Sequence, residues 1–279
     1  MTCPCAGASR EWFVSEAGID DPTCGTTLQT ACRTLDTAAH SARPGDVLRI
    51  DPSSSAPYRL PCVHPASQSD QGFALQSLTV TTLNSSDRPT IGCETRTSAA
   101  DAAAAASRCA LRLENVTMKG IDLEVDDCHV TIIGSHLLES TVYTTRACRS
   151  LRMRMTRTNW TFTGHLPCGK IASRGNNATE PCRQTLINRL SCSSVDVTLD
   201  LVRLLLGSLE IYSRYSTHVY VVESQFTGDP DSPRSQFLGG LRLTFSAIGA
   251  NITLINSVFS NQASSSLILV DLACSNCDI

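Results

Sequence analysis

The sequence is poor in charged residues and in long apolar runs. Only 18% of its 279 residues are charged, and the formal net charge is −3. This balance argues against a protein that binds nucleic acid through phosphate contacts, which would be strongly basic. With 42% hydrophobic residues the chain also differs from disordered proteins, which combine high charge with few apolar residues. No apolar run reaches the roughly 20 residues of a membrane-spanning helix, so we expect no transmembrane segment within this chain.

Cysteine, in contrast, is abundant. The 14 cysteines lie between Cys3 and Cys277, and so many thiols are difficult to keep reduced and idle in the cytosol. The count therefore indicates an oxidising compartment and a disulfide framework.

Glycosylation sequons are a second indication of the compartment. Five Asn-X-Ser/Thr triplets without an intervening proline occur, and together with the cysteines they predict an extracellular glycoprotein, secreted or at the cell surface. No apolar signal-peptide segment is present near Met1, so we expect a processed or excised part of a longer secreted or membrane-anchored protein. The expected acceptors are Asn84, Asn115, Asn159, Asn177 and Asn251.

The first 50 residues follow a pattern of strand, helix and strand. Trp12-Phe13-Val14 favours a short strand, and Val47 to Ile50 favours another. Between them, apolar residues at helical spacing predict a helix that begins at Thr26 or Thr27 and ends before Pro44-Gly45. The recurring apolar residues are Leu28, Ala31, Leu35 and Ala38.

The same segment resembles a known structural element. Its pattern is Phe13-Val-Ser15…Gly18…Cys24-Gly-Thr26…Ala31-Cys-Arg-Thr-Leu35…Ala38…Pro44-Gly-Asp46-Val-Leu-Arg-Ile50. This pattern is similar to the N-terminal cap of right-handed parallel β-helix (pectin-lyase-like) proteins. In that family, a short amphipathic helix plugs the open end of the coil before the first rung, that is, before the first complete turn of the coil.

Short β-rich runs recur along the rest of the chain. Val197 to Val219 and Val219 to Leu241 are each 22 residues apart, Val130 to Met153 is 23, and Met153 to Val197 is 44, which we interpret as two periods. A repeat near 22 residues is typical of one rung of a parallel β-helix. A β-sandwich, which has a turn about every 8–12 residues, does not explain this spacing.

Three of these runs share a further pattern. Those beginning at Val130, Val219 and Ile252 each alternate apolar residues, then place Ser five positions after the first apolar residue and another apolar residue two further on. Because Ile252 lies 33 residues after Val219, a turn and a half, we expect more than one side of the coil to use the pattern.

We therefore predict an all-β fold, a right-handed parallel β-helix with an N-terminal capping helix. Residues 1–11 would form a tail, and residues 12–279 a single domain with the cap at 12–50 and the rungs at 51–279. Loops are expected to project from the rungs at 97–106, 164–181 and 228–233.

The cysteines fit this fold as covalent braces. Cys3-X-Cys5 and Cys274-X-X-Cys277 have zinc-ligand spacing, but a shared site would have to join opposite ends of the coil, so we expect no metal and no cofactor. Fourteen cysteines allow on the order of 10⁵ pairings. The local pairs that we expect are Cys24–Cys32 across the cap, Cys168–Cys182 across a loop and Cys128–Cys148 between neighbouring rungs, with Cys274 and Cys277 as further disulfide candidates.

The sequons differ in their expected surroundings. Asn84, Asn159 and Asn177 lie in or beside expected loops and are the better glycan acceptors. Asn115 and Asn251 precede β-runs, where an Asn in a stacked coil often hydrogen-bonds its neighbour in the next rung instead.

Catalysis requires a direct test, because many β-helix proteins cleave acidic polysaccharides. Enzymes of this shape gather acidic residues from neighbouring rungs, yet no two acidic residues lie 22 apart. Opposite charges do, in Glu124–Arg146 and Asp127–Arg149, which favours ion pairs on an outer face over a catalytic dyad at Asp126-Asp127. The looser acidic pairs, 21 or 23 residues apart, are Asp101–Asp122, Asp101–Glu124, Asp200–Glu223 and Glu210–Asp231.

Two groups of residues are candidates for binding a partner. Between Leu151 and Met155, alternation places Arg152 and Arg154 on the face opposite the apolar residues, where guanidinium groups suit an anionic glycan. The second group runs from Tyr212 to Tyr220 and has the residue types of interface hot spots. On an unbroken strand its face would carry Tyr212, Arg214, Ser216, His218 and Tyr220. For both groups the alternative is a solvated outer face.

These observations favour a non-catalytic extracellular module for binding, adhesion or structural support, with an extracellular protein or an anionic glycan as its partner. The alternative is a carbohydrate-active enzyme of the same fold, a polysaccharide lyase or glycoside hydrolase. A bacterial surface β-helix is a third interpretation, which the cysteine count disfavours.

Overall fold

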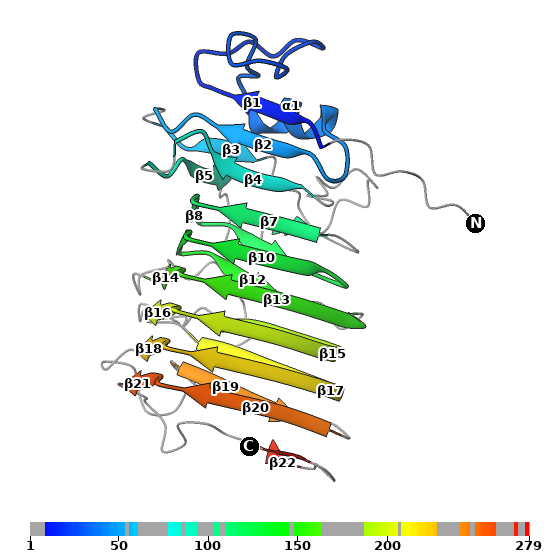
Figure 1. The fold of residues 1–279 in the computed structure, drawn as a ribbon, viewed down its shortest axis with the longest axis vertical. Helices are drawn as coiled ribbons and strands as arrows, with labels where there is room; N and C mark the ends of the chain where they lie inside the picture. Colours follow the sequence, from blue (N-terminus) through cyan, green and yellow to red (C-terminus); the bar gives the residue numbers. More distant parts are fainter. Residues whose placement is uncertain are drawn as a thin grey trace, which may run out of the picture.

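Parallel β-sheets dominate the computed structural model, which describes residues 9–53, 56–60, 78–84, 87–93, 103–105, 110–144, 148–162, 187–205, 208–227, 240–245, 249–260, 271–272 and 277–278. Within these residues there are three sheets and one helix, and the strands stack in sequence order along the long axis of the molecule (Figure 1). Every strand pairing in this part of the chain is parallel. The described part of the chain contains no helix that could span a lipid bilayer.

We name the sheets A, B and C. Sheet A contains β1 (Glu11–Val14), β2 (Val47–Ile50), β4 (Thr79–Thr82), β7 (Ala110–Glu114), β10 (His129–Ile133), β13 (Ser150–Thr156), β15 (Ile187–Asp200), β17 (Ser208–Val222), β19 (Gly240–Phe245), β20 (Gly249–Ile255), β22 (Asp271–Leu272) and β23 (Cys277–Asp278). Sheet B contains β3 (Tyr58–Leu60), β5 (Thr90–Cys93), β8 (Thr117–Lys119), β11 (His136–Leu138), β14 (Asn159–Thr161), β16 (Arg203–Leu205), β18 (Gln225–Thr227) and β21 (Val258–Ser260). Sheet C contains β6 (Ala103–Ala105), β9 (Asp122–Glu124) and β12 (Thr141–Tyr143). Strand β6 thus lies inside the segment 97–106 that we expected to be a loop.

The chain visits the three sheets in a fixed order. Strand β7 of sheet A is followed by β8 of sheet B and β9 of sheet C, and β10, β11 and β12 repeat that order. Each such set of strands is one rung, and each strand pairs in register with the equivalent strand of the next rung. This arrangement is compatible with the parallel β-helix that the sequence indicates.

Alternation along the strands separates core from surface. In β13, Met153 is buried between the exposed Arg152 and Arg154. In-register pairing stacks inward-facing residues into apolar columns that run through successive rungs, and burial of such columns is the main stabilising term. One column consists of Leu111, Val130, Met153, Val197, Val219 and Ile252, all of which are buried.

Two-residue corners connect the strands of sheet A to those of sheet B. The first corner residue is left-handed in six rungs, with φ between 46° and 59°, a region that residues other than glycine seldom adopt. In five of these six rungs the second residue is buried, and in three of the five it is a hydroxyl residue: Ser135, Thr158 or Ser224. The first residues are Asn115, Gly134, Arg157, Leu201, Glu223 and Asn256.

The buried hydroxyls satisfy backbone groups that the corner leaves unpaired. Ser224 Oγ accepts the N–H of Val202 in the preceding rung at 3.1 Å and donates to the carbonyl of Val222 at 2.8 Å. Ser135 makes the equivalent bonds with the N–H of Val116 at 3.3 Å and the carbonyl of Ile133 at 3.0 Å. The Ser that recurs five positions after the first apolar residue of a run is therefore this corner residue.

The spacing of the rungs differs in part from the expected period. Val197 pairs with Val219 and Val130 with Met153, as expected for neighbouring rungs. Met153, however, pairs directly with Val197, so 44 residues span one rung and not two. Val219 pairs with Ile252, one rung later, and Leu241 pairs with Leu209, so the 33-residue separation is not a turn and a half. Extra residues between the strands, not extra rungs, account for the longer separations.

Strands β15 and β17 each contain a bend. Their pairing register shifts between Cys192 and Ser194. Before the shift, Ser191 exchanges hydrogen bonds with Thr144 Oγ1, directly after β12, at 2.6 and 3.1 Å, so this half continues sheet C. The first half of β17 pairs with β19, and the second half pairs with β20. Each long strand therefore belongs to two faces of the stack.

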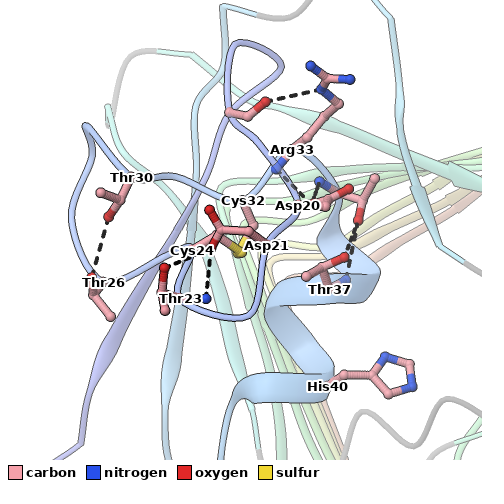
Figure 2. Close-up of a disulfide and its surroundings, with 12 residues drawn as sticks. Asp20, Asp21, Thr23, Cys24, Thr26, Thr30, Cys32, Arg33, Thr37 and His40 are labelled. Atoms are coloured by element: carbon pink, nitrogen blue, oxygen red, sulfur yellow. Dashed lines mark hydrogen bonds between the residues drawn. A yellow bond between two sulfur atoms is a disulfide. The ribbon is translucent and has the colours of Figure 1, made fainter.

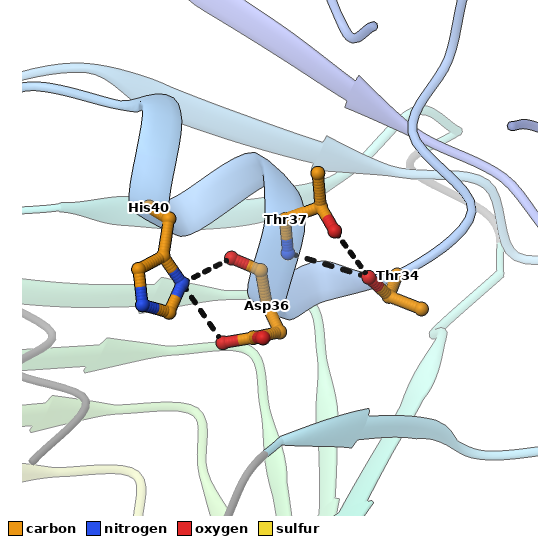
Figure 3. A network of polar contacts seen from close by, with 4 residues as sticks. All are labelled: Thr34, Asp36, Thr37 and His40. Atoms are coloured by element: carbon orange, nitrogen blue, oxygen red, sulfur yellow. Dashed lines mark hydrogen bonds and ion pairs between the residues drawn. The ribbon is translucent and has the colours of Figure 1, made fainter. Parts of the chain in front are cut away.

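The N-terminal helix α1 (Leu35–Ser41) is shorter than predicted. It begins after Thr34, whose Oγ1 accepts the backbone N–H of Thr37 at 3.3 Å (Figure 3). Leu35 and Ala38 are buried, as their helical spacing predicts. Leu28 and Ala31, which we also assigned to the helix, precede it in turns. The helical spacing from Leu28 to Ala38 therefore predicted the second half of this segment correctly. The first half is a loop closed by a disulfide and not a helix.

That loop is fixed by the Cys24–Cys32 disulfide, as expected from the sequence (Figure 2). Asp20 Oδ1 accepts the N–H groups of Arg33 and Thr34, each at 2.9 Å, directly before the helix. Cys32 also forms a parallel bridge with Val14 at the end of β1. The loop, α1 and the first two strands of sheet A are therefore linked to one another.

Asp46, directly before β2, connects the start of the described chain at Arg10 and Trp12 with the segment that follows α1 at Arg43. Its carboxylate accepts hydrogen bonds from the backbone N–H groups of Arg10 and Arg43 and from the Trp12 indole, each at 2.9 Å. Burial alone would raise the pKa of Asp46, but these hydrogen bonds outweigh it and lower the pKa below its usual value.

The second disulfide corrects an expected pairing. Cys148 is bonded to Cys192, not to Cys128. The reason is the register, since Ser150 pairs with Ser194 and so brings positions 148 and 192 side by side in neighbouring rungs. Cys128 is disulfide-bonded as well. Cys168, Cys182 and Cys274 lie outside the described residues, as does the side chain of Cys277. These disulfides are consistent with an extracellular protein.

The corner hydroxyl yields a first prediction. Ser224→Ala should lower the free energy of unfolding by about 1–3 kcal/mol, because the buried N–H of Val202 loses its acceptor. Ser224→Thr should retain most of the stability, since Thr158 fills the equivalent position in another rung. Urea unfolding monitored by circular dichroism measures both. If Ser224→Ala costs no more than Gln225→Ala at the exposed neighbouring residue, the corner hydroxyl has no stabilising role.

The inter-rung disulfide yields a second prediction. Replacing Cys148 and Cys192 together by Ser should lower the free energy of unfolding by about 2–4 kcal/mol, because the bond closes a long loop in the unfolded chain. Chemical denaturation of the double variant and of the wild type, both under oxidising conditions, tests this. Equal unfolding midpoints would contradict the stabilising role of the bond.

Candidate functional site

Four of the candidate ligand-binding residues, Arg152, Arg154, His218 and Tyr220, are exposed on the outer face of sheet A. In-register pairing aligns His129, Arg152, Asp196 and His218 in one row across β10, β13, β15 and β17. A parallel row two residues further along the strands consists of Thr131, Arg154, Thr198 and Tyr220. Neighbouring residues in such a row are about 4.8 Å apart.

The structure thus brings together two groups that the sequence keeps apart. Arg154 and Tyr220 are separated by 66 residues (154 to 220) but lie only two strands apart, with Thr198 between them. Because we interpreted 44 residues as two periods, the sequence placed β13 and β15 in non-adjacent rungs. Asp196 and Thr198 were therefore missed. The alternation of Val195-Asp-Val-Thr-Leu199, which matches that of Leu151-Arg-Met-Arg-Met155, was the signal that could have identified them.

The first row borders a groove of about 580 Å³. The groove opens on the outer face of sheet A, beside the first residues of β10 and β13 and the residues of β15 and β17 that follow their register shift. Its lining is mostly polar and includes Asp127, His129, Arg152, Asp196, Ser216 and His218. Arg152 and His218, which come from different sequence groups, thus share one groove.

The charges of the groove are already partly paired. Arg152 Nε lies 3.1 Å from Asp196 Oδ2, and both side chains are largely exposed, so this ion pair contributes little to stability. It does hold the guanidinium in position through Nε, and no residue of the described part of the chain forms a hydrogen bond with its Nη groups. Arg154 is exposed and forms no ion pair within the described part of the chain.

Asp127 has a structural role at the edge of the groove. It has a left-handed φ of 53°, and its Oδ1 accepts the backbone N–H groups of Arg149 at 2.6 Å and Ser150 at 3.0 Å. Asp127 and Arg149 are therefore neighbours, as expected, and the side chain of Asp127 binds the backbone N–H of Arg149. Arg146 and the side chain of Glu124 lie outside the described residues.

Tyr212 and Arg214 lie apart from His218 and Tyr220. Tyr212 lies before the register shift of β17, and its partner is Thr244 of β19, whereas His218 and Tyr220 lie after the shift. The bend therefore interrupts the continuous face that an unbroken strand would have formed. The side chain of Arg214 is outside the described residues, and Tyr215, which we did not single out, is exposed at the bend.

Four of the five sequons can be located. Asn84 and Asn251 are exposed. Asn115 is partly buried, with its Oδ1 against Gly134 of the next rung. Asn159 does not lie in a loop but opens β14, where its Nδ2 donates to His136 Nε2 at 3.1 Å. Asn177 lies outside the described residues.

His136 accepts hydrogen bonds from two sides. Besides Asn159, Arg88 Nη1 donates to His136 Nε2 at 3.1 Å, and Arg88 Nε donates to the carbonyl of Gly134 at 2.8 Å. Nε2 accepts both hydrogen bonds and therefore carries no proton, so the imidazole is neutral. Burial, followed by the charge of Arg88, lowers the pKa of His136.

Within the described residues, no three His, Cys, Asp or Glu side chains lie close enough to hold a metal ion. Comparison of the chain with family models, with curated proteins and with solved structures gave no match. The functional argument consequently depends on the geometry of the chain itself.

The His136 contacts yield a prediction of pH dependence. Because the pKa of His136 is lower in the folded state, the unfolded chain binds a proton at this residue first as the pH falls. The contribution of His136 to the free energy of unfolding is therefore fully present above about pH 6.5 and is lost as the pH falls below that value. His136→Gln should make the free energy of unfolding less dependent on pH between pH 7.5 and 5. Arg88→Gln should reduce the dependence in part. Urea unfolding at several pH values tests this, and an unchanged slope in His136→Gln would contradict it.

Proposed function

We propose that this chain is a right-handed parallel β-helix of the pectin-lyase-like type, with its cap at residues 12–50 and its rungs at 51–279 in a single domain. The in-register stacking of sheets A, B and C supports this proposal. So do the two-residue corners that repeat from rung to rung, and the short helix α1 before the first rungs.

We further propose that it is a non-catalytic extracellular binding module, part of a larger secreted or membrane-anchored protein, and that it binds an anionic glycan. The observation that carries this proposal is the in-register alignment of Arg152 with His218 and of Arg154 with Tyr220 on one outer face. A flat face with regular spacing between rungs suits a long, repetitive ligand.

The chemistry of the face fits such a ligand. The guanidinium of Arg154 is exposed and can form two parallel hydrogen bonds with a carboxylate or sulfate. Arg152 is oriented by Asp196 through Nε, which leaves its Nη groups for the same contact. Tyr220 is 44% exposed, and the electron-rich face of its ring attracts the C–H groups of a sugar ring. The face therefore combines anionic contacts with an aromatic surface.

The carboxylates of the groove favour binding over catalysis. Most glycosidases need two free carboxyl groups, one that protonates the leaving group and one that acts as a base on water or as a nucleophile. Asp127 accepts two backbone N–H groups, and Asp196 is paired with Arg152. The carbohydrate-active enzyme nevertheless stays a testable alternative, because both carboxylates line the same groove.

A binding experiment tests the proposal. The secreted protein is applied to an array of sulfated and uronate-containing oligosaccharides, and the wild type is compared with Arg152→Ala/Arg154→Ala. The double variant should lose about tenfold or more in affinity, because charge-assisted hydrogen bonds are lost. Arg203→Ala, which removes an exposed Arg from sheet B, is the matched control and should leave the affinity unchanged.

Three outcomes would contradict the proposal. Unchanged glycan binding in the double variant would exclude the arginine surface. New reducing or unsaturated ends in the bound oligosaccharides would favour the enzyme. Binding to an extracellular protein in a surface-proteome screen, without any glycan binding, would favour a protein partner.

A further inference from the structure

The sequon at Asn251 lies beside the proposed binding face. Asn251 and Thr253 alternate with the buried Ile252 on β20, so both point outward from sheet A. Strand β20 is the next strand after β17, and the register pairs Asn251 with His218 and Thr253 with Tyr220. Asn251 therefore continues the row that contains Arg152 and Asp196.

The side-chain amide of Asn251 is available for modification. Asn251 is exposed, and within the described residues no hydrogen bond to its side chain is formed. Two other sequons differ in this respect, because Asn159 Nδ2 is bonded to His136 and Asn115 Oδ1 contacts Gly134. Asn84 is exposed as well, but it follows β4, several rungs away. Of the sequons that the structure describes near the groove, Asn251 is the accessible one.

Tyr220 provides a surface on which the first sugar can pack. It is a diagonal neighbour of Asn251 on the adjacent strand, and diagonal neighbours in a sheet are within reach of long side chains. A sugar attached to Asn251 Nδ2 extends further than any side chain. The exposed ring of Tyr220 and the imidazole of His218 are the nearest outward-facing groups of β17.

We infer that Asn251 carries an N-linked glycan whose first sugars pack on Tyr220 and cover His218 at the β17 side of the groove. The glycan competes with an external ligand for Tyr220 and leaves the β10 to β15 side, with Arg152 and Arg154, open. This effect on ligand binding depends on the function proposed above, whereas the modification and its packing do not.

The modification is tested first. The protein is secreted from mammalian cells, and glycopeptides are analysed by mass spectrometry. Asn251 should be occupied in most molecules, and Asn159 and Asn115 in few. A predominantly unmodified Asn251 would overturn the inference.

Packing on Tyr220 is tested by thermal unfolding of the secreted protein. Thr253→Ala removes the sequon and should lower the midpoint by about 2 °C or more. In a Tyr220→Ala background the same change should have no effect, because the sugar has lost its contact. Asn251→Gln should reproduce the result, and Asn84→Gln is the matched sequon control. An equal effect of Thr253→Ala with and without Tyr220 would overturn the packing.

Binding of a heparin-derived hexasaccharide separates this inference from the proposed function. Thr253→Ala should bind about fivefold more tightly than the glycosylated wild type, and Arg154→Ala should weaken binding in both. If Arg154→Ala has no effect, the proposed function fails, while occupancy and packing stand on their own measurements. If Arg154→Ala weakens binding but Thr253→Ala does not strengthen it, coverage of the groove by the glycan is excluded.

Discussion

In-register parallel pairing between successive rungs is the constraint on which the rest of this structure depends. Each inner strand of sheet A satisfies its backbone groups with the strands before and after it in the sheet, and the register then places like positions side by side. Inward positions become continuous apolar columns such as the one through Val130, Met153 and Val197. The corners follow the same rule, since Ser135 and Ser224 each bind a backbone N–H of the preceding rung.

The same register organises the outer surface, and this is the basis of the functional proposal. A side chain that points outward at one position is followed, about 4.8 Å away, by the outward side chain of the next rung. Residues far apart in the sequence therefore form rows, and Arg154, Thr198 and Tyr220 are one of them. The row that continues from His218 reaches the exposed sequon at Asn251 and then Asp278 of β23, so the binding face and the site of its modification have one structural origin.

Much of the parallel β structure could be predicted from local patterns. Alternation in Leu151 to Met155 identified a strand with Arg152 and Arg154 outside, and the pairing of Cys24 with Cys32 followed from proximity. What could not be predicted is the length of chain between strands, because alternation describes a strand but not its partner. The 44 residues between Met153 and Val197 were therefore taken for two rungs. The Cys148–Cys192 bond and the role of Asp196 were missed for the same reason.

The central claim is that β13, β15 and β17 form one binding face. A crystal structure of the secreted protein, with its sequon at Asn251 removed by Thr253→Ala, in complex with a sulfated oligosaccharide tests this claim most directly. The account predicts ordered sugar density over the outer face of sheet A that contacts Arg152 and Arg154 of β13 and Tyr220 of β17 in the same ligand. An oligosaccharide bound at another surface, with this face empty, would contradict it.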